Sequence, residues 1–175
     1  MSLKPDQALF LLNCMLPTLQ NEHRITRAVL DAIPVEKAME YRPDAVSKSA
    51  FDLAWHIAAT ENVFLKAVSA GAFDFAPQTK PQSMAELISF FDETYQKNIA
   101  AIQQLTGEQL ATIIDFRGMF KLAAVEYLGF SNSHSIHHRG QLSMYLRPMG
   151  AKVPSMYGES YDGAQARQSA ATARA

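Results

Sequence analysis

The chain has 175 residues, of which 48% are hydrophobic and 19% are charged, and its formal net charge is −1 at pH 7. This balance is typical of one globular domain and not of a disordered or fibrous chain. A net charge so close to zero gives no broad attraction to nucleic acid or to an anionic membrane, so we expect neither as a partner.

The first predicted element is a helix over about 6–32, because apolar residues recur there at three- and four-residue steps. Pro17 removes a backbone donor and is expected to kink or divide this helix, and Pro34 ends it. Cys14 is the single cysteine, so it cannot form an internal disulfide, and we expect a small buried side chain. With no convincing targeting segment at the N-terminus, these features favour a cytoplasmic location.

The next two predicted helices begin with capping signals. A capping-box pattern at Ser49 opens the second helix, and Gly71 ends it. A second pattern of this kind at Ser83 opens the third helix, which runs to about Leu105. The residues between them, 72–81, contain two prolines and are predicted to form a crossover loop.

The last third of the chain contains one more long helix. A short, partly β-like connection between Gly107 and Gly118 precedes a fourth helix over about 121–146. Four long helices with few strands indicate an all-α four-helix bundle, and its long connections allow a topology other than up-down-up-down. We therefore predict a single domain over 1–163 and, from its composition, a flexible C-terminal tail over 164–175.

The sequence lacks a Gly-rich phosphate loop, a G-x-S-x-G elbow and a Cys-x-x-Cys pair, so its chemistry must come from the histidines. His134 and His138 lie four apart on one helix, about 40° apart around its axis, and can reach one metal ion. A third ligand is needed. His56, on an apolar helix face, is the first candidate, and His23 on the first helix is the competing one. His137 points about 100° away from His138 and is interpreted as a solvated or interface residue.

Three groups of residues form a further pattern. They are Ala32-Ile33-Pro34 with Tyr41-Arg42-Pro43; Lys48-Ser49-Ala50 with Leu53-Ala54-Trp55-His56-Ile57-Ala58; and His134-Ser135-Ile136-His137-His138-Arg139-Gly140-Gln141-Leu142 with Tyr145-Leu146-Arg147-Pro148-Met149-Gly150 and Val153-Pro154. In order and spacing, they resemble the motifs of the DinB family, from the exit of its first helix to its C-terminal signature. The resemblance implies an up-down-down-up bundle, usually a homodimer. The family's metal histidines carry over onto His56, His134 and His138.

The resemblance also implies a function. Related proteins include thiol-dependent transferases and isomerases that use bacillithiol, mycothiol or similar cofactors. Three imidazole ligands leave an open coordination position and suit zinc, nickel, iron or copper. The resemblance thus favours a divalent-metal-dependent enzyme that transfers a small thiol to an electrophilic small-molecule substrate. Metal-assisted hydrolysis is the alternative mechanism. A non-catalytic stress-response dimer with a structural or vestigial metal is the alternative function.

Residues around the three histidines are candidates for supporting roles. Gln141 and Tyr145 fall on the ligand face of the last helix and are the catalytic candidates. A packing role explains Gln141 equally well, and for Tyr145 a core position is the better explanation. Asp52, one helical turn before the ligand on the second helix, is placed to accept a ring N–H. No carboxylate is an obvious general base. Glu61 lies too far round its helix from the ligand face, and the position of Glu22 on the first helix is the single reason to consider it.

Overall fold

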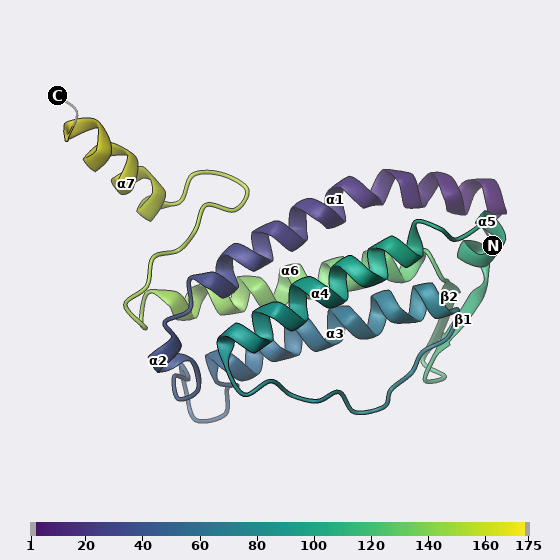
Figure 1. Cartoon of the computed structure of the whole chain (residues 1–175), viewed down its shortest axis with the longest axis horizontal. Coiled ribbons are helices and arrows are strands. Elements are labelled where there is room, and N and C mark those ends of the chain that lie inside the picture. Colours follow the sequence, from purple (N-terminus) through teal and green to yellow (C-terminus); the bar gives the residue numbers. More distant parts are fainter. Residues whose placement is uncertain (1–2, 174–175) are drawn as a thin grey trace.

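The computed structural model describes residues 3–173. Its four long helices are α1 (Pro5–Asp31), α3 (Ala50–Ala70), α4 (Met84–Ile102) and α6 (Glu126–Leu146). The shorter elements are α2 (Val35–Ala38), α5 (Gly107–Ala111), β1 (Ile113–Phe116), β2 (Phe120–Ala123) and α7 (Tyr161–Thr172). The helices α1 and α6 run in one direction along the bundle, and α3 and α4 run in the other (Figure 1). This is the up-down-down-up bundle that the sequence predicts.

The helix boundaries follow from local chemistry. The side chains of Ser49 and Ser83 accept hydrogen bonds from the backbone N–H groups of Asp52 and Glu86, which caps α3 and α4. Gly71 ends α3 in the left-handed region, with φ of 74°, where the absence of a Cβ removes the steric penalty. These caps confirm the predicted starts of both helices and the end of α3.

The parallel arrangement of α3 and α4 requires a long return connection. The segment 71–83 connects the end of α3 to the start of α4 and runs back along the length of the bundle (Figure 1). Gln78 fastens it to α3, because its side chain accepts from Asn62 Nδ2 at 2.6 Å and donates to the Ala59 carbonyl at 2.9 Å. The loop therefore stays against α3 and forms one wall of a cavity beside it.

The start of the last long helix differs from the prediction. Residues 121–123 belong to β2, which pairs antiparallel with β1 from Ile113 opposite Ala123 to Phe116 opposite Phe120. The helix α6 consequently begins at Glu126 rather than near 121. The sequence indicated a partly β-like connection before this helix, but it did not indicate a second strand. The second strand of the hairpin contains residues 121–123, which the prediction had assigned to the helix.

Two predictions for the first helix are also corrected. Pro17 lies exposed on the outer side of α1, and the helix is continuous through it, so the proline does not divide the helix. A kink at Pro17 stays a prediction. Cys14 is exposed rather than buried, because it lies on the same outer side. Residues 164–172 of the predicted tail are helical in α7, which buries no residue and extends away from the bundle (Figure 1). The domain boundary at residue 163 stays a prediction.

The interior of the bundle is divided into two apolar clusters by a polar layer. One cluster lies at the hairpin end and includes Leu12 and Tyr127, and the other lies toward α2 and includes Phe51 and Leu142. Every long helix contributes a buried polar or charged residue between the clusters: Glu22, Thr26, Glu61, Asn98, Ser131, Ser135 and Arg139. We call this set the polar layer. The packing of α3 against α6 brings histidines of these two helices together.

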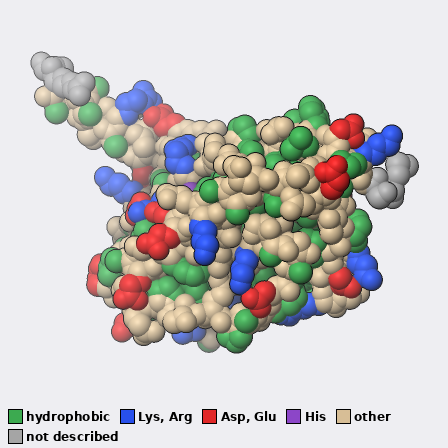
Figure 2. Space-filling view, turned by 45° about the vertical axis from the view of Figure 1, so that its right-hand side comes forward, with side chains coloured by type: hydrophobic (Ala, Val, Ile, Leu, Met, Phe, Trp, Pro, Cys, Tyr) green, Lys and Arg blue, Asp and Glu red, His purple; other side chains and the backbone are tan. Residues whose placement is uncertain are grey.

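The visible surface carries charges of both signs (Figure 2). On the face shown in Figure 2, acidic and basic side chains are interspersed over the surface. No helix in the described part of the chain has both the length and the apolar character that crossing a membrane requires.

Candidate metal centre

The packing of α3 against α6 brings three histidines together. His134 and His138 lie on successive turns of α6, and His56 faces them from the middle of α3. The Nε2 atom of His56 lies 3.0 Å from Nε2 of His134 and 3.1 Å from Nε2 of His138. One nitrogen from each ring lies within 4.8 Å of the other two. We call these three residues the histidine triad. It is a group that could hold a metal ion.

The spacing of the triad suits a metal ion. Zinc binds imidazole nitrogen at about 2.0–2.1 Å, so two ligands at tetrahedral to right angles lie roughly 2.9–3.4 Å apart. The distances from Nε2 of His56 to the other two Nε2 atoms, 3.0 and 3.1 Å, fall in this range. Lone pairs of neutral imidazoles that face one another repel unless a proton or a cation lies between them. The donor set and its spacing therefore fit a divalent metal.

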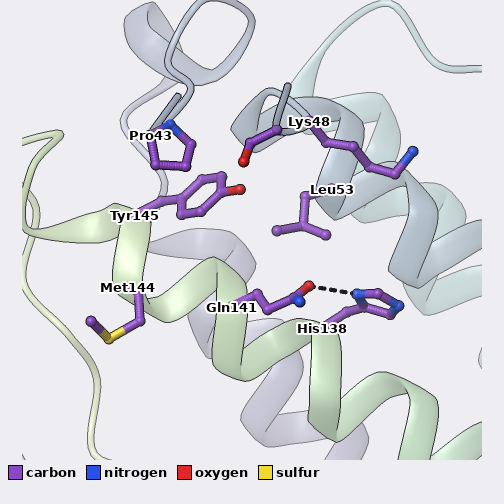
Figure 3. A pocket seen from close by; sticks show the side chains of 8 residues that line it. Pro43, Lys48, Leu53, His138, Gln141, Met144 and Tyr145 are labelled. Atoms are coloured by element: carbon purple, nitrogen blue, oxygen red, sulfur yellow. Dashed lines mark hydrogen bonds between the residues drawn. The ribbon is translucent and has the colours of Figure 1, made fainter. Parts of the chain in front are cut away.

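Gln141 fixes the orientation of one ring of the triad. The Oε1 atom of Gln141 lies 2.7 Å from Nδ1 of His138, as the dashed line in Figure 3 shows. Because the amide oxygen only accepts, this contact places the ring proton on Nδ1 and leaves the Nε2 lone pair free. The amide nitrogen donates in turn to Nε2 of His137 at 3.2 Å. His137 itself is exposed and lies outside the triad.

Burial disfavours the charged form of two rings of the triad, those of His134 and His56. Burial, followed by the proximity of His138 and His56, lowers the pKa of His134 from 6.5 to about 4. Burial also lowers the pKa of His56, with smaller contributions from His138 and Lys48. Neutral rings with free lone pairs are the form that binds a metal. The Nδ1 atom of His134 is buried without a protein partner, so this ring lacks the support that Gln141 gives to His138.

His23 does not join the triad. Its ring is stacked between Phe91 and Tyr95, with ring centroids 4.2 and 3.8 Å away. Its two nitrogens face separate carboxylates, Nδ1 toward Glu61 at 3.4 Å and Nε2 toward Asp92 at 3.2 Å. The competing third ligand is thereby excluded in favour of His56. Glu61 is turned toward His23, away from the triad.

The other two carboxylates named from the sequence have different partners. Asp52 forms an ion pair with Lys80 on the surface instead of accepting a ring N–H from the triad. Glu22 is buried, where it pairs with Nη1 of Arg139 at 2.7 Å and accepts the Tyr157 hydroxyl at 2.7 Å. Glu22 is therefore a structural partner of Arg139, and its position on the first helix does not make it a base.

Three cavities open beside the triad. The first has a volume of about 420 Å³, reaches His138 and is shown in Figure 3. Its other lining residues are Pro43, Ser47, Lys48, Leu53, Gln141, Met144 and Tyr145. The second, about 350 Å³, reaches His56 from the side of Arg42 and Trp55. The third, about 430 Å³, reaches His56 from the hairpin side. Gln141 and Tyr145, the predicted catalytic candidates, both line the first cavity, and their roles stay a prediction.

Lys48 is a residue of this site that the sequence analysis quoted only as part of a motif. It lines both the first and the second cavity, and in Figure 3 its side chain extends above His138. Its place depends on the course of the segment 41–49, which has no regular secondary structure. A basic residue directly before the helix cap at Ser49 was the available signal, but no local pattern predicts the direction of that loop.

Comparisons with known proteins point to one family. The sequence model described as the DinB family matches residues 7–170. An uncharacterized Bacillus subtilis protein, YjoA, is 34% identical over 114 residues, which cover 63% of this chain and 73% of that protein.

Two solved structures have a similar fold. The crystal structure of the DinB-like protein YjoA from Bacillus subtilis gives a TM-score of 0.67 at 26% identity and covers 79% of this chain and 94% of that one. A DinB-like protein from Bacillus cereus ATCC 10987 gives a TM-score of 0.69 at 25% identity, with 81% and 94% covered.

Proposed function

The chain belongs to the DinB family, and from that premise we propose that it is a divalent-metal-dependent enzyme that transfers a small thiol to an electrophilic substrate. One observation carries the proposal. Three imidazole nitrogens meet at 3.0 and 3.1 Å in a group that borders three open cavities. A purely structural metal site is closed by protein ligands, whereas a catalytic one keeps a position open.

His56, His134 and His138 would hold the metal, which we propose to be zinc, nickel or iron. A bound divalent metal lowers the pKa of a coordinated thiol or water and so provides a nucleophile at neutral pH. The protein holds the His138 ring through Gln141, which makes Gln141 a positioning residue. The Tyr145 hydroxyl is directed into the first cavity (Figure 3), where we propose that it donates a hydrogen bond to the electrophile.

The surroundings of the triad favour a thiol over water as the nucleophile. Among the described residues that line the three cavities, Asp52 is the one carboxylate, and it is paired with Lys80. Hydrolases usually need a base that takes a proton from water, whereas a thiol ionises with a pKa of only about 8.5. In the proposed reaction the sulfur forms a bond to carbon, the leaving atom takes the electron pair, and the thiol proton passes to solvent. Lys48 would attract the negative charge that builds up.

The first test is elemental analysis of tag-free protein without added metal. We expect about one equivalent of divalent metal in the wild type and almost none in the variant His134→Ala/His138→Ala. His137→Ala is the matched control, because it removes an imidazole from the same helix outside the triad and should keep the metal. Equal, negligible metal in all three proteins would refute the metal centre.

The second test separates an enzyme from a non-catalytic metal protein. Metal-loaded wild type is assayed with low-molecular-weight thiols and a fluorogenic alkylating electrophile, beside His56→Ala and His137→Ala. We expect thiol-dependent turnover in the wild type and in His137→Ala, and its loss in His56→Ala. Full metal occupancy without turnover for any thiol would favour the structural role. We further propose that the protein is a homodimer, as its family resemblance implies.

A further inference from the structure

The third cavity beside the triad leads away from it toward the β-hairpin. It starts at His56, follows α3 past Val63 and Phe64, and ends at Phe116 and Arg117 on the hairpin. From His56 to Phe64 the helix advances about 12 Å, which is longer than a single aromatic ring. The return loop closes the opposite side with Phe75 and Gln78. We call this cavity the aromatic groove.

The walls of the aromatic groove are suited to a planar apolar group. The rings of Phe64 and Phe116 are stacked, with centroids 5.7 Å apart, and Phe75 meets Phe116 edge-on at 5.6 Å. These rings come from three separate segments: a helix, a loop and a hairpin. Phe75 remains 38% exposed, so part of this apolar surface is uncovered. Offset and edge-on contacts of this kind are the ones that aromatic groups form with a further ring.

Arg117 lies at the far end of the groove in an unusual conformation. It is the one described residue other than glycine with a positive φ, 55°, a region that arginine rarely occupies. Its guanidinium lies 4.0 Å from the centre of the Phe75 ring. The nearby carboxylate of Asp115 instead contacts Lys121 at 3.5 Å and accepts the Gly118 N–H at 2.6 Å. Among the described residues, Arg117 forms no ion pair.

A turn of this kind favours glycine or asparagine, so arginine at this position is a choice with a conformational cost. A binding role for the Arg117 side chain would explain this conformational cost. A planar guanidinium without a carboxylate partner, set at the mouth of an aromatic groove, binds a carboxylate through paired N–H donors. Its contact with Phe75 holds it at that mouth.

We infer that the aromatic groove is a substrate subsite, which takes an aromatic arm ending in a carboxylate. The aromatic group lies in the groove against the wall that Phe64, Phe75 and Phe116 form, the carboxylate meets Arg117, and the reactive end of the substrate lies toward His56. This inference rests on the proposed function, because it specifies the substrate class for the same metal centre. It selects aromatic carboxylic acids that carry an electrophilic group at the other end.

The test uses 3-phenylpropionate as the probe, because it has the ring and the carboxylate but no electrophile. Its dissociation constant is measured by calorimetry on the zinc-loaded full chain, beside that of the neutral 3-phenylpropionamide. Arg117→Asn suits the left-handed turn and removes the guanidinium, together with its contact with Phe75. We expect it to weaken binding of the acid about tenfold and to leave binding of the amide unchanged. Phe75→Ala is expected to weaken binding of both.

Lys121→Gln is the matched control, because it removes one positive charge from the same hairpin but does not line the groove. It should bind the acid within about twofold of the wild type, which would show that the Arg117 effect is local and not a change in net charge. The inference is overturned if Arg117→Asn binds the acid as the wild type does, or if Lys121→Gln loses as much affinity. It is also overturned if no binding is seen at about 10 mM acid.

The same titration on His134→Ala/His138→Ala separates this inference from the proposed function. The aromatic arm is expected to contact neither residue, so Arg117-dependent binding should persist in that variant. A wild type that takes up no metal but binds the acid through Arg117 would overturn the metal function and support the groove. A wild type that takes up metal but ignores the acid would overturn the groove alone.

Discussion

At the scale of single residues, the candidate site depends on which nitrogen of each histidine is free. His138 is held with Nε2 toward the triad by Gln141, while His134 relies on burial alone. The sequence predicted His56, His134 and His138 from helical spacing and family resemblance, and the fold brings these three together. It could not predict the Gln141 contact, because a side chain on the right helix face can still turn to solvent.

The depressed pKa of His134 predicts a pH-dependent stability of the metal-free protein. The folded ring has a pKa of about 4 instead of 6.5, so between these values the unfolded chain binds more protons. Stability should therefore fall as the pH falls from 6.5 to 4. The ring is only half-buried, so the effect should be about 1–2 kcal/mol after allowance for solvent screening.

Urea denaturation of metal-free wild type and His134→Asn at several pH values measures this effect. The difference in unfolding free energy between the two proteins removes the contribution of the surface carboxylates, which both share. A difference that stays constant between pH 6.5 and 4 would contradict the prediction.

At the scale of elements, most helix ends were predictable and one was not. Ser49, Gly71 and Ser83 act through bonds within their own turns, so local sequence specifies them. The start of α6 depends instead on strand pairing between 113–116 and 120–123, a contact that periodicity cannot reveal. The same hairpin supplies Phe116 and Arg117, and the site at that end of the bundle was missed for this reason.

The ion pair between α1 and α6 predicts a large loss of stability. Arg139 is 1% exposed and contacts Glu22, the Glu22 carbonyl and Thr26. Removing it as Arg139→Met leaves a buried carboxylate without its cation, and we expect a cost of about 3–5 kcal/mol. Unfolding in urea, followed by circular dichroism, gives the value.

An exposed pair provides the comparison. Arg167 pairs with Glu159 at 2.7 Å, but its side chain is 71% exposed. Arg167→Met should therefore leave the unfolding free energy almost unchanged, because solvent screens an exposed pair. Equal costs for Arg139→Met and Arg167→Met would show that the buried pair contributes no more than a surface one.

At the scale of the whole molecule, four long helices with few strands predicted the bundle, and the parallel direction of α3 and α4 came only with the family resemblance. Composition cannot reveal this direction. A connection as long as 71–83 can join two antiparallel helices through a long loop, or two parallel helices by running back along the bundle. The composition of the last twelve residues likewise predicted a tail, although α7 extends helically as far as Thr172.

A chain that ends at Gly163 tests the single-domain prediction. The helix α7 buries no residue, so its removal should shift the thermal unfolding midpoint by no more than about 2 °C. Light scattering should give twice 19.4 kDa for the full chain, and a dimer for the shortened chain as well. A large fall in the midpoint, or a monomer in either case, would contradict the corresponding proposal.

The polar layer also limits how the helices can slide past one another. A shift of α6 by one turn moves each of its side chains by about 5.4 Å along the axis. Such a shift would carry Arg139 out of reach of Glu22 and toward the apolar side chains on either side. The penalty for an unpaired buried charge makes that register unstable, with or without a bound ion. His56 and His138 belong to different helices. Because the buried ion pair keeps α6 in one register, the nitrogens of these two histidines stay close together without a bound metal.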